Sequence, residues 1–208
     1  MARPGGNRNG LRDPVSDPRP HAVWLIRHGE TAWTASRQHT GRTDIPLTDL
    51  GEEHARAVHA YLAGRTFALV LTSPLARARR TCELAGYGAV AQVEPDLAEW
   101  DYGEVEGKTT DEFRRTHPGW LIWDDGPPGG ETADQVGARA DRVIARCATV
   151  GGEVALFGHA HQLRILAARW LEMPAINGRH FLMNTASVSV LGWERDTRAI
   201  ASWNYPAR

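Results

Sequence analysis

An arginine and a histidine, Arg27 and His28, stand side by side directly after the apolar run of residues 22–26. Such a run is typical of a buried strand, and Gly29 frees the backbone just beyond it, which places His28 at the strand's carboxyl end. A neutral imidazole is a nucleophile near neutral pH, and an adjacent guanidinium can donate two hydrogen bonds to a phosphoryl group. The pair is suited to forming a phosphohistidine. A lone Arg-His-Gly triplet, however, fits a packed histidine and a surface arginine equally well.

Two further mostly apolar runs that predict buried strands, residues 67–71 and 153–157, are also followed by groups that can bind phosphate. Arg77 follows the first run and His159 follows the second. Because parallel strands of an open α/β sheet bring their carboxyl ends to one crevice, we expect these groups to converge with His28. Helix N-termini at the same crevice would add groups that attract anions. Taken singly, Arg77 also fits a solvated helix residue and His159 a hydrogen-bonded core histidine.

Phosphoryl transfer from an alcohol also needs an acid, because the departing oxygen must receive a proton. Glu99 is our candidate, since a carboxylic acid held near an anion can retain its proton. Asp101, Glu104 and Glu106 lie close by in the sequence and could perform the same chemistry. Spacing alone does not separate these four carboxyl groups.

The elements that must position these groups alternate between strands and helices. Strands are predicted over residues 22–26, 67–71, 153–157, 181–190 and 198–203, with a turn at 192–197 between the last two. Helices are predicted over residues 51–63, from 72–74 onward, over 131–150 and over 162–171. Thr48 is the expected N-cap of the first helix, and Pro74 is expected in the first turn of the second. This alternation is typical of an α/β domain with a mostly parallel sheet.

The composition restricts the partners of the chain. A formal net charge of −1 over 208 residues provides no global field for nucleic acid or an anionic membrane, and no run of basic residues binds either locally. Only one of the 24 basic residues is a lysine, Lys108, so abundant arginine is weak evidence for phosphate binding. No apolar stretch approaches the ~18 residues that cross a bilayer. We expect a cytoplasmic protein, either a monomer or a homodimer.

The length fits one domain, which we expect to span residues 21–208. Residues 1–20 are rich in glycine, proline and arginine and contain no apolar segment, which predicts a disordered tail. Cys82 and Cys147 lie in helix-like stretches without metal-ligand spacing, so we expect two reduced packing residues and no metal site.

Five motifs, in order along the chain, resemble those of the phosphoglycerate mutase-like histidine phosphatase superfamily. They are RHGET at residues 27–31, Gly41 with TDIPLT at 43–48, SPLARARRT at 73–81, EWDYG at 99–103 and GH at 158–159. The resemblance runs from about residue 22 to about residue 205. It implies a three-layer α/β/α sandwich with a central, mostly parallel sheet. It also implies a two-step reaction through a phosphohistidine that needs neither a metal nor a cofactor.

The resemblance also assigns roles to individual residues. His28 matches the nucleophile and Glu99 the proton donor, while Arg27, Arg77 and His159 match the phosphate pocket. Further substrate contacts are implied for a second group of residues: Thr34, Gln38, Thr40, Gly41, Tyr102 and the backbone N–H of Ala160. The chain departs from the family at Gly158, where serine or alanine is common, and at Ala160, where glycine is usual. A backbone contact from residue 160 needs no side chain and should survive.

Within this superfamily, the short segment 104–130 favours hydrolysis, because the cofactor-dependent mutases carry a longer insertion that closes over the substrate. Trp120 and Trp123 in this segment fit either packing or substrate contact. Together with the 38–44 run, the segment resembles small acid phosphatases and sugar-bisphosphate phosphatases. We therefore expect a phosphomonoesterase acting on sugar phosphates or phosphoglycerate-type metabolites. The alternatives are a cofactor-dependent phosphoglycerate mutase and a non-catalytic module that binds phosphorylated ligands.

Overall fold

The structure is a computed structural model that describes residues 19–207. The predicted N-terminal tail, residues 1–20, lies almost wholly outside the described residues. Its last residue, Pro20, opens the first strand.

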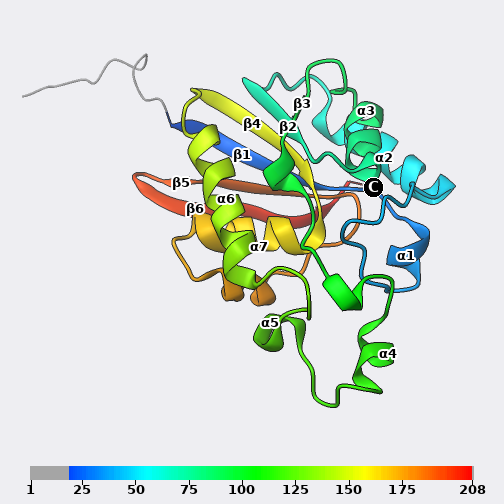
Figure 1. Ribbon diagram of the computed structural model, residues 1–208. Coiled ribbons are helices and arrows are strands. Elements are labelled where there is room, and N and C mark those ends of the chain that lie inside the picture. The colour runs from blue at the N-terminus through cyan, green and yellow to red at the C-terminus, as the bar shows by residue number, and fades with distance from the viewer. Residues whose placement is uncertain (1–18, 208) are drawn as a thin grey trace, which may run out of the picture.

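A six-stranded sheet runs through the described residues in the order β3-β2-β4-β1-β5-β6 (Figure 1). The strands are β1 Pro20–Arg27, β2 Leu69–Thr72, β3 Gln92–Val93, β4 Gly152–Gly158, β5 Ser187–Glu194 and β6 Thr197–Pro206. Neighbours among β3, β2, β4 and β1 pair in parallel, whereas β5 is antiparallel to β1 and β6 is antiparallel to β5. The mostly parallel sheet predicted from the sequence is confirmed.

The register of the parallel strands brings their carboxyl ends together. Arg27 at the end of β1 lies opposite Gly158 at the end of β4, and Thr72 at the end of β2 lies opposite Phe157. The residues that follow these three strands therefore begin side by side at one edge of the sheet, where open α/β folds bind their ligands.

Seven α-helices and three short 3₁₀ segments connect the described strands. The α-helices are α1 Ala32–Ala35, α2 Asp49–Leu62, α3 Ala76–Leu84, α4 Thr110–Arg114, α5 Ile122–Asp125, α6 Ala133–Cys147 and α7 Ala160–Trp170. The 3₁₀ segments are η1 Pro95–Leu97, η2 Gly103–Val105 and η3 Ala175–His180. Thr48 caps α2 as predicted, because its hydroxyl accepts from the N–H of Gly51. Pro74 is not in the first turn of α3: that helix begins at Ala76, after the N-cap Leu75.

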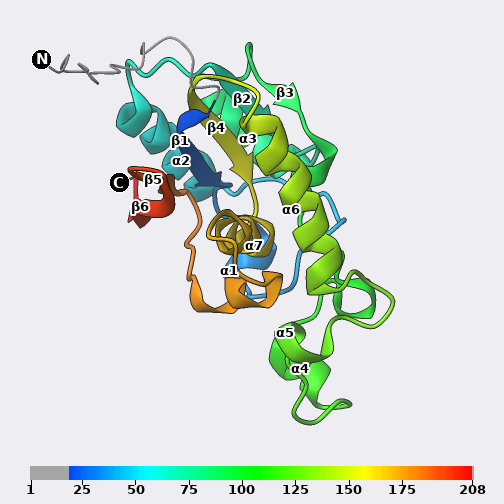
Figure 2. The same cartoon turned by 90° about the vertical axis from the view of Figure 1, so that its left-hand side faces the viewer.

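Two apolar clusters, one on each face of the sheet, produce three layers. Successive residues of a strand point to opposite faces. In β1, Val23 and Leu25 pack into a cluster with residues of α6 and α7, whereas Trp24 and Ile26 pack with residues of α2 and α3. Figure 2 shows α2 and α6 on opposite sides of the strands. The α/β/α sandwich predicted for this chain is confirmed.

In the C-terminal hairpin, the first strand begins later than its apolar pattern indicated, whereas the turn falls within the predicted residues 192–197 and β6 covers the predicted strand 198–203. The strand predicted over 181–190 begins only at Ser187, and the turn lies at Arg195, whose φ of 57° is left-handed, so that Gly192 stays inside β5. The apolar residue Leu182, 72% exposed, belongs to a loop. That loop is held by the strand-end residues, since the N–H of Ala186 donates to the carbonyl of His28. Tertiary contacts therefore override the local pattern here.

The segment 104–130, which sequence patterns left without a predicted element, folds into part of η2, α4 and α5 and projects away from the sheet (Figure 1). Its two tryptophans pack against neighbouring rings. Trp120 lies 4.7 Å from Phe113, and Trp123 lies 5.4 Å from Trp100, between ring centroids. The packing alternative therefore holds for both tryptophans.

Both cysteines, Cys82 and Cys147, are free and buried, as expected. Burial raises the pKa of each thiol to about 12, so both stay protonated at neutral pH. They act as small apolar packing residues.

Candidate active site

His28 leaves the end of β1 with one ring nitrogen occupied and the other open. Its Nδ1 lies 2.7 Å from the carbonyl oxygen of Gly29, which can only accept, so Nδ1 carries the proton. Burial, reinforced by the nearby charges of Arg77 and Arg27, holds the pKa of His28 well below its ordinary value. The ring is therefore neutral at neutral pH, and its Nε2 keeps the lone pair that a nucleophile needs.

A glycine must follow His28 because the N-terminus of α2 packs against this turn. A Cβ on Gly29 would lie 2.3 Å from the carbonyl oxygen of Gly51, and one on Gly51 would lie 2.1 Å from that of Glu30. Both contacts are far closer than a methyl group tolerates. Any side chain at position 29 would therefore displace the histidine.

Arg27 lines the same cavity as His28 and is held at one end only. Its Nη1 donates to the carbonyl of Met183 at 2.5 Å, while its buried Nε–H has no hydrogen-bond partner among the described residues. Burial lowers the pKa of Arg27 to about 10, which still leaves a cation at neutral pH. A buried cation with an unused donor is a strong attraction for an anion.

Arg77 is completely buried, and its guanidinium donates four hydrogen bonds to the protein. Nη2 donates to the carbonyls of Thr40 and Gly41, both at 2.9 Å, and Nη1 donates to the carbonyl of Thr43 at 3.0 Å. Its Nε donates to Nδ1 of His159 at 3.2 Å. Arg77 therefore lies behind the cavity lining, where it holds the 40–43 loop and orients His159.

His159 stands directly behind His28, with ring centroids 5.1 Å apart. Because its Nδ1 accepts from Arg77, the neutral ring carries its proton on Nε2, which lies 2.7 Å from the hydroxyl of Ser73. Burial and the charge of Arg77 hold the pKa of His159 well below its ordinary value. The sheet thus brings all three predicted strand-end residues together, with His28 in the cavity wall and the other two behind it.

Glu99 is the one member of the four carboxyl groups that lines this cavity. Its Oε1 accepts from the backbone N–H groups of Trp100 and Gln162, both at 2.9 Å, and its Oε2 accepts from that of His161 at 3.2 Å. The three donors fix the orientation of the carboxyl group at the first turn of α7.

The other three carboxyl groups have different surroundings. Asp101 pairs with Arg42 at 2.7 Å, and Glu106 accepts from the backbone N–H groups of Gly41 and Thr43. Glu104 is exposed. The geometry therefore separates Glu99 from its neighbours, which sequence spacing alone does not.

The cavity has a volume of about 190 Å³. Five of the six residues expected to contact substrate line it, namely Thr34, Gln38, Thr40, Tyr102 and Ala160. The backbone N–H of Ala160, at the start of α7, donates to no described residue and is open for a ligand. Gly41 does not line the cavity, because its N–H faces the carboxylate of Glu106 and its carbonyl faces Arg77.

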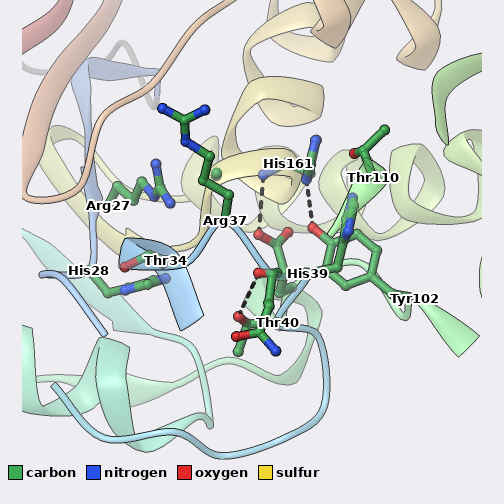
Figure 3. A pocket seen from close by; sticks show the side chains of 12 residues that line it. Arg27, His28, Thr34, Arg37, His39, Thr40, Tyr102, Thr110 and His161 are labelled. Atoms are coloured by element: carbon green, nitrogen blue, oxygen red, sulfur yellow. Dashed lines mark hydrogen bonds between the residues drawn. The ribbon is translucent and has the colours of Figure 1, made fainter. Parts of the chain in front are cut away.

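Four residues that were not singled out also line the cavity: Arg37, His39, Thr110 and His161. His161 lies two positions after His159 at a helix start, and His39 adjoins Gln38, so both positions carried a signal. Arg37 has a left-handed φ of 63° that no pattern indicated. Thr110 comes from the projecting segment. Figure 3 shows Tyr102, Thr110 and His161 on one side of the cavity, and Arg27 and His28 on the other.

Three buried imidazoles make the stability of the fold sensitive to mild acid. Burial holds the pKa values of His28, His159 and His161 well below the ordinary value of 6.5. The unfolded chain therefore binds protons below pH 6.5 that the folded chain does not. The stability that the three neutral rings contribute to the folded chain is present in full above pH 6.5 and is lost as the pH falls below it. The unfolding free energy should drop by up to about 1.4 kcal/mol per pH unit for each such imidazole.

Urea unfolding measured between about pH 7.5 and 5.5 checks this expectation, because carboxyl groups titrate mainly below that window. His161→Asn removes one of the three imidazoles and should make the slope shallower. An unfolding free energy that stays constant across the window would contradict the expectation.

Among residues 19–207, no group of histidine, cysteine or acidic side chains is arranged to hold a metal ion. No helix in the same range is long and apolar enough to cross a membrane.

Comparisons with known proteins match nearly all of the described chain. The family model for the histidine phosphatase superfamily, branch 1, matches residues 23–206. An acid phosphatase of Mycobacterium tuberculosis is 39% identical over 192 residues, which cover 88% of this chain and 92% of that protein. A sedoheptulose 1,7-bisphosphatase of Saccharomyces cerevisiae is 34% identical over 178 residues, covering 70% of this chain and 66% of that protein. A solved structure of a Mycobacterium tuberculosis open reading frame product has a TM-score of 0.84 at 37% identity, covering 91% of this chain and 100% of that one.

Proposed function

This chain belongs to branch 1 of the histidine phosphatase superfamily, and we propose that it hydrolyses small phosphomonoesters through a phosphohistidine at His28. The predicted family and the predicted enzyme class, a phosphatase, are confirmed by the match and by the named relatives. The observation that carries the mechanism is the neutral His28 ring, whose open Nε2 shares a cavity with Arg27 and Glu99.

The phosphate group binds at the Arg27 end of the cavity. The guanidinium of Arg27 and the free N–H of Ala160, which both line the cavity, donate to its oxygens. Arg77 supplies positive potential from behind, and the neutral ring of His159, hydrogen-bonded to Arg77, adds rigidity. Donors held in place before the substrate arrives need no reorganisation as charge develops at phosphorus. This arrangement accounts for the electrostatic part of catalysis.

Two displacements at phosphorus complete the reaction. In the first, His28 Nε2 forms a bond to phosphorus while the bond to the alcohol oxygen breaks, and Glu99 gives its proton to that oxygen. In the second, water attacks the phosphohistidine, Glu99 takes a proton from the water, and the bond between phosphorus and Nε2 breaks. Phosphate leaves, and both residues return to their initial states.

The proposed substrates are small sugar phosphates and phosphoglycerate-type esters. The cavity of about 190 Å³ suits a small ester and is below the usual range for drug-sized ligands. A cytoplasmic location, a monomeric or homodimeric state and a single domain over residues 21–208 stay predictions from the sequence.

Phosphate release from a panel of phosphomonoesters, measured with EDTA present from about pH 5 to 8, tests the proposal. We expect release from small sugar phosphates without any added metal. A mutase would instead isomerise 3-phosphoglycerate only after addition of 2,3-bisphosphoglycerate, with little free phosphate. Binding of phosphate without turnover of any ester would indicate a non-catalytic module.

A further inference from the structure

Two histidines that line the cavity, His39 and His161, have no part in the phosphoryl transfer. Both flank Tyr102, with ring centroids 5.0 Å and 5.8 Å from the tyrosine ring. Figure 3 shows Tyr102 and His161 on the side of the cavity away from His28. An in-line displacement directs the leaving group away from the attacking nitrogen. This side of the cavity therefore faces the leaving alcohol.

His39 offers a hydrogen-bond acceptor. Its Nδ1 lies 2.8 Å from the carbonyl oxygen of Lys108, which can only accept, so Nδ1 carries the proton. Burial lowers the pKa of His39, and the ring is neutral at neutral pH. Its Nε2 keeps a lone pair, has no partner among the described residues and is not enclosed by the protein. Because His39 lines the cavity, this lone pair is an acceptor that the residue can offer to a ligand there.

His161 offers a donor, because Tyr102 fixes the opposite tautomer. The phenol oxygen of Tyr102 lies 2.5 Å from Nδ1 of His161. Burial raises the pKa of Tyr102 well above its ordinary value, so the phenol keeps its hydrogen, and Nδ1 is its one acceptor among the described residues. Burial also lowers the pKa of His161, which leaves a neutral ring with its proton on Nε2. That N–H is likewise not enclosed.

We propose that Nε2 of His39 and Nε2–H of His161 together bind one hydroxyl group of the leaving alcohol and so select phosphate esters of polyhydroxylated alcohols. A hydroxyl both donates and accepts, which matches one acceptor and one donor. A carboxylate or a second phosphate only accepts, and its oxygen would face the lone pair of His39. This inference rests on the proposed phosphatase function and specifies its substrate class.

The test compares glycerol 3-phosphate with n-propyl phosphate, which has the same carbon chain without hydroxyl groups. We expect wild-type kcat/KM to favour the glycerol ester by roughly 100-fold, because each of two hydrogen bonds contributes about tenfold. The matched variants are His39→Asn and His161→Asn. In each, the asparagine amide can replace the Nδ1 hydrogen bond while the Nε2 group is lost.

Each variant should lower the preference for the glycerol ester by about tenfold. Tyr102→Phe should also lower the preference, because it frees the tautomer of His161. His180→Asn, an exposed histidine outside the cavity, is the control and should leave both rates unchanged.

Three results would overturn the inference. Equal wild-type kcat/KM values for the two esters would show that the site does not recognise a hydroxyl group of the leaving alcohol, although the phosphatase function would stand. Equal losses on both esters in the variants, with the ratio unchanged, would indicate a merely structural role for the two histidines. Hydrolysis of neither ester, nor of any other ester in the panel, would remove the proposed function and the inference with it.

Discussion

His28→Ala should abolish phosphate release, with a loss of at least about 10⁴-fold in kcat, because no other group at the cavity can form the covalent intermediate. Arg27 is a cation, and the neutral rings of His39 and His161 lie on the other side of the cavity from the phosphate end. Wild-type protein quenched during turnover of a radiolabelled ester should carry an acid-labile phosphoryl label, and the variant should carry none.

The control for this prediction is His21→Ala, since His21 is exposed on the same strand, β1. It should retain wild-type activity. Two backbone hydrogen bonds of His28 survive loss of the ring: its N–H donates to the carbonyl of Gly158, and its carbonyl accepts from the N–H of Ala186. A far-ultraviolet circular dichroism spectrum therefore separates loss of the nucleophile from loss of the fold. Activity in His28→Ala within tenfold of wild type would rule out His28 as the nucleophile.

Glu99→Gln should slow hydrolysis of an alkyl phosphate by about 10² to 10⁴-fold, because the leaving alkoxide then receives no proton. The effect should depend on the leaving group. p-Nitrophenolate departs without a proton, so the first displacement with p-nitrophenyl phosphate should stay comparatively fast. The second displacement still lacks its base. Stopped-flow absorbance should therefore show a burst of about one nitrophenolate per active site, followed by slow turnover.

Glu104→Gln is the matched control, since Glu104 lies close to Glu99 in the sequence but carries an exposed carboxyl group outside the cavity. It should leave both phases unchanged. If Glu99→Gln slowed the burst as strongly as it slowed alkyl phosphate hydrolysis, the carboxyl group would act by orienting the substrate and not by moving a proton.

The sheet and its site-bearing strand ends could be predicted because apolar runs and helix caps are local signals. The run at residues 22–26 lies inside β1, and Thr48 caps α2 as expected. Predictions failed where distant contacts decide the conformation. Residues 181–186 form a loop because that loop meets Arg27 and His28 through Met183 and Ala186. Sequence separation hides such contacts from any local pattern.

The phosphate end of the site was accessible to sequence reasoning, whereas at the leaving-group end that reasoning anticipated Tyr102 but not the two histidines beside it. His28, Arg77 and His159 each follow a buried strand, so topology alone brings them together. His39 and His161 become a pair only through Lys108 and Tyr102, which come from separate loops. The tautomer of His161 depends on a hydrogen bond with Tyr102, 59 positions away in the sequence. The tautomer of His39 depends on a hydrogen bond with Lys108, 69 positions away.

Arg77 holds the 40–43 loop by carbonyl oxygens, which every residue type possesses. The side chains at positions 40 and 43 can therefore change under selection without releasing the arginine. Gly41 cannot, because a Cβ there would lie 2.6 Å from the carboxylate of Glu106 and 2.7 Å from the carbonyl of Trp100. A directed-evolution library aimed at new substrates can thus randomise Thr40 and Thr43 while the phosphate-handling machinery stays assembled.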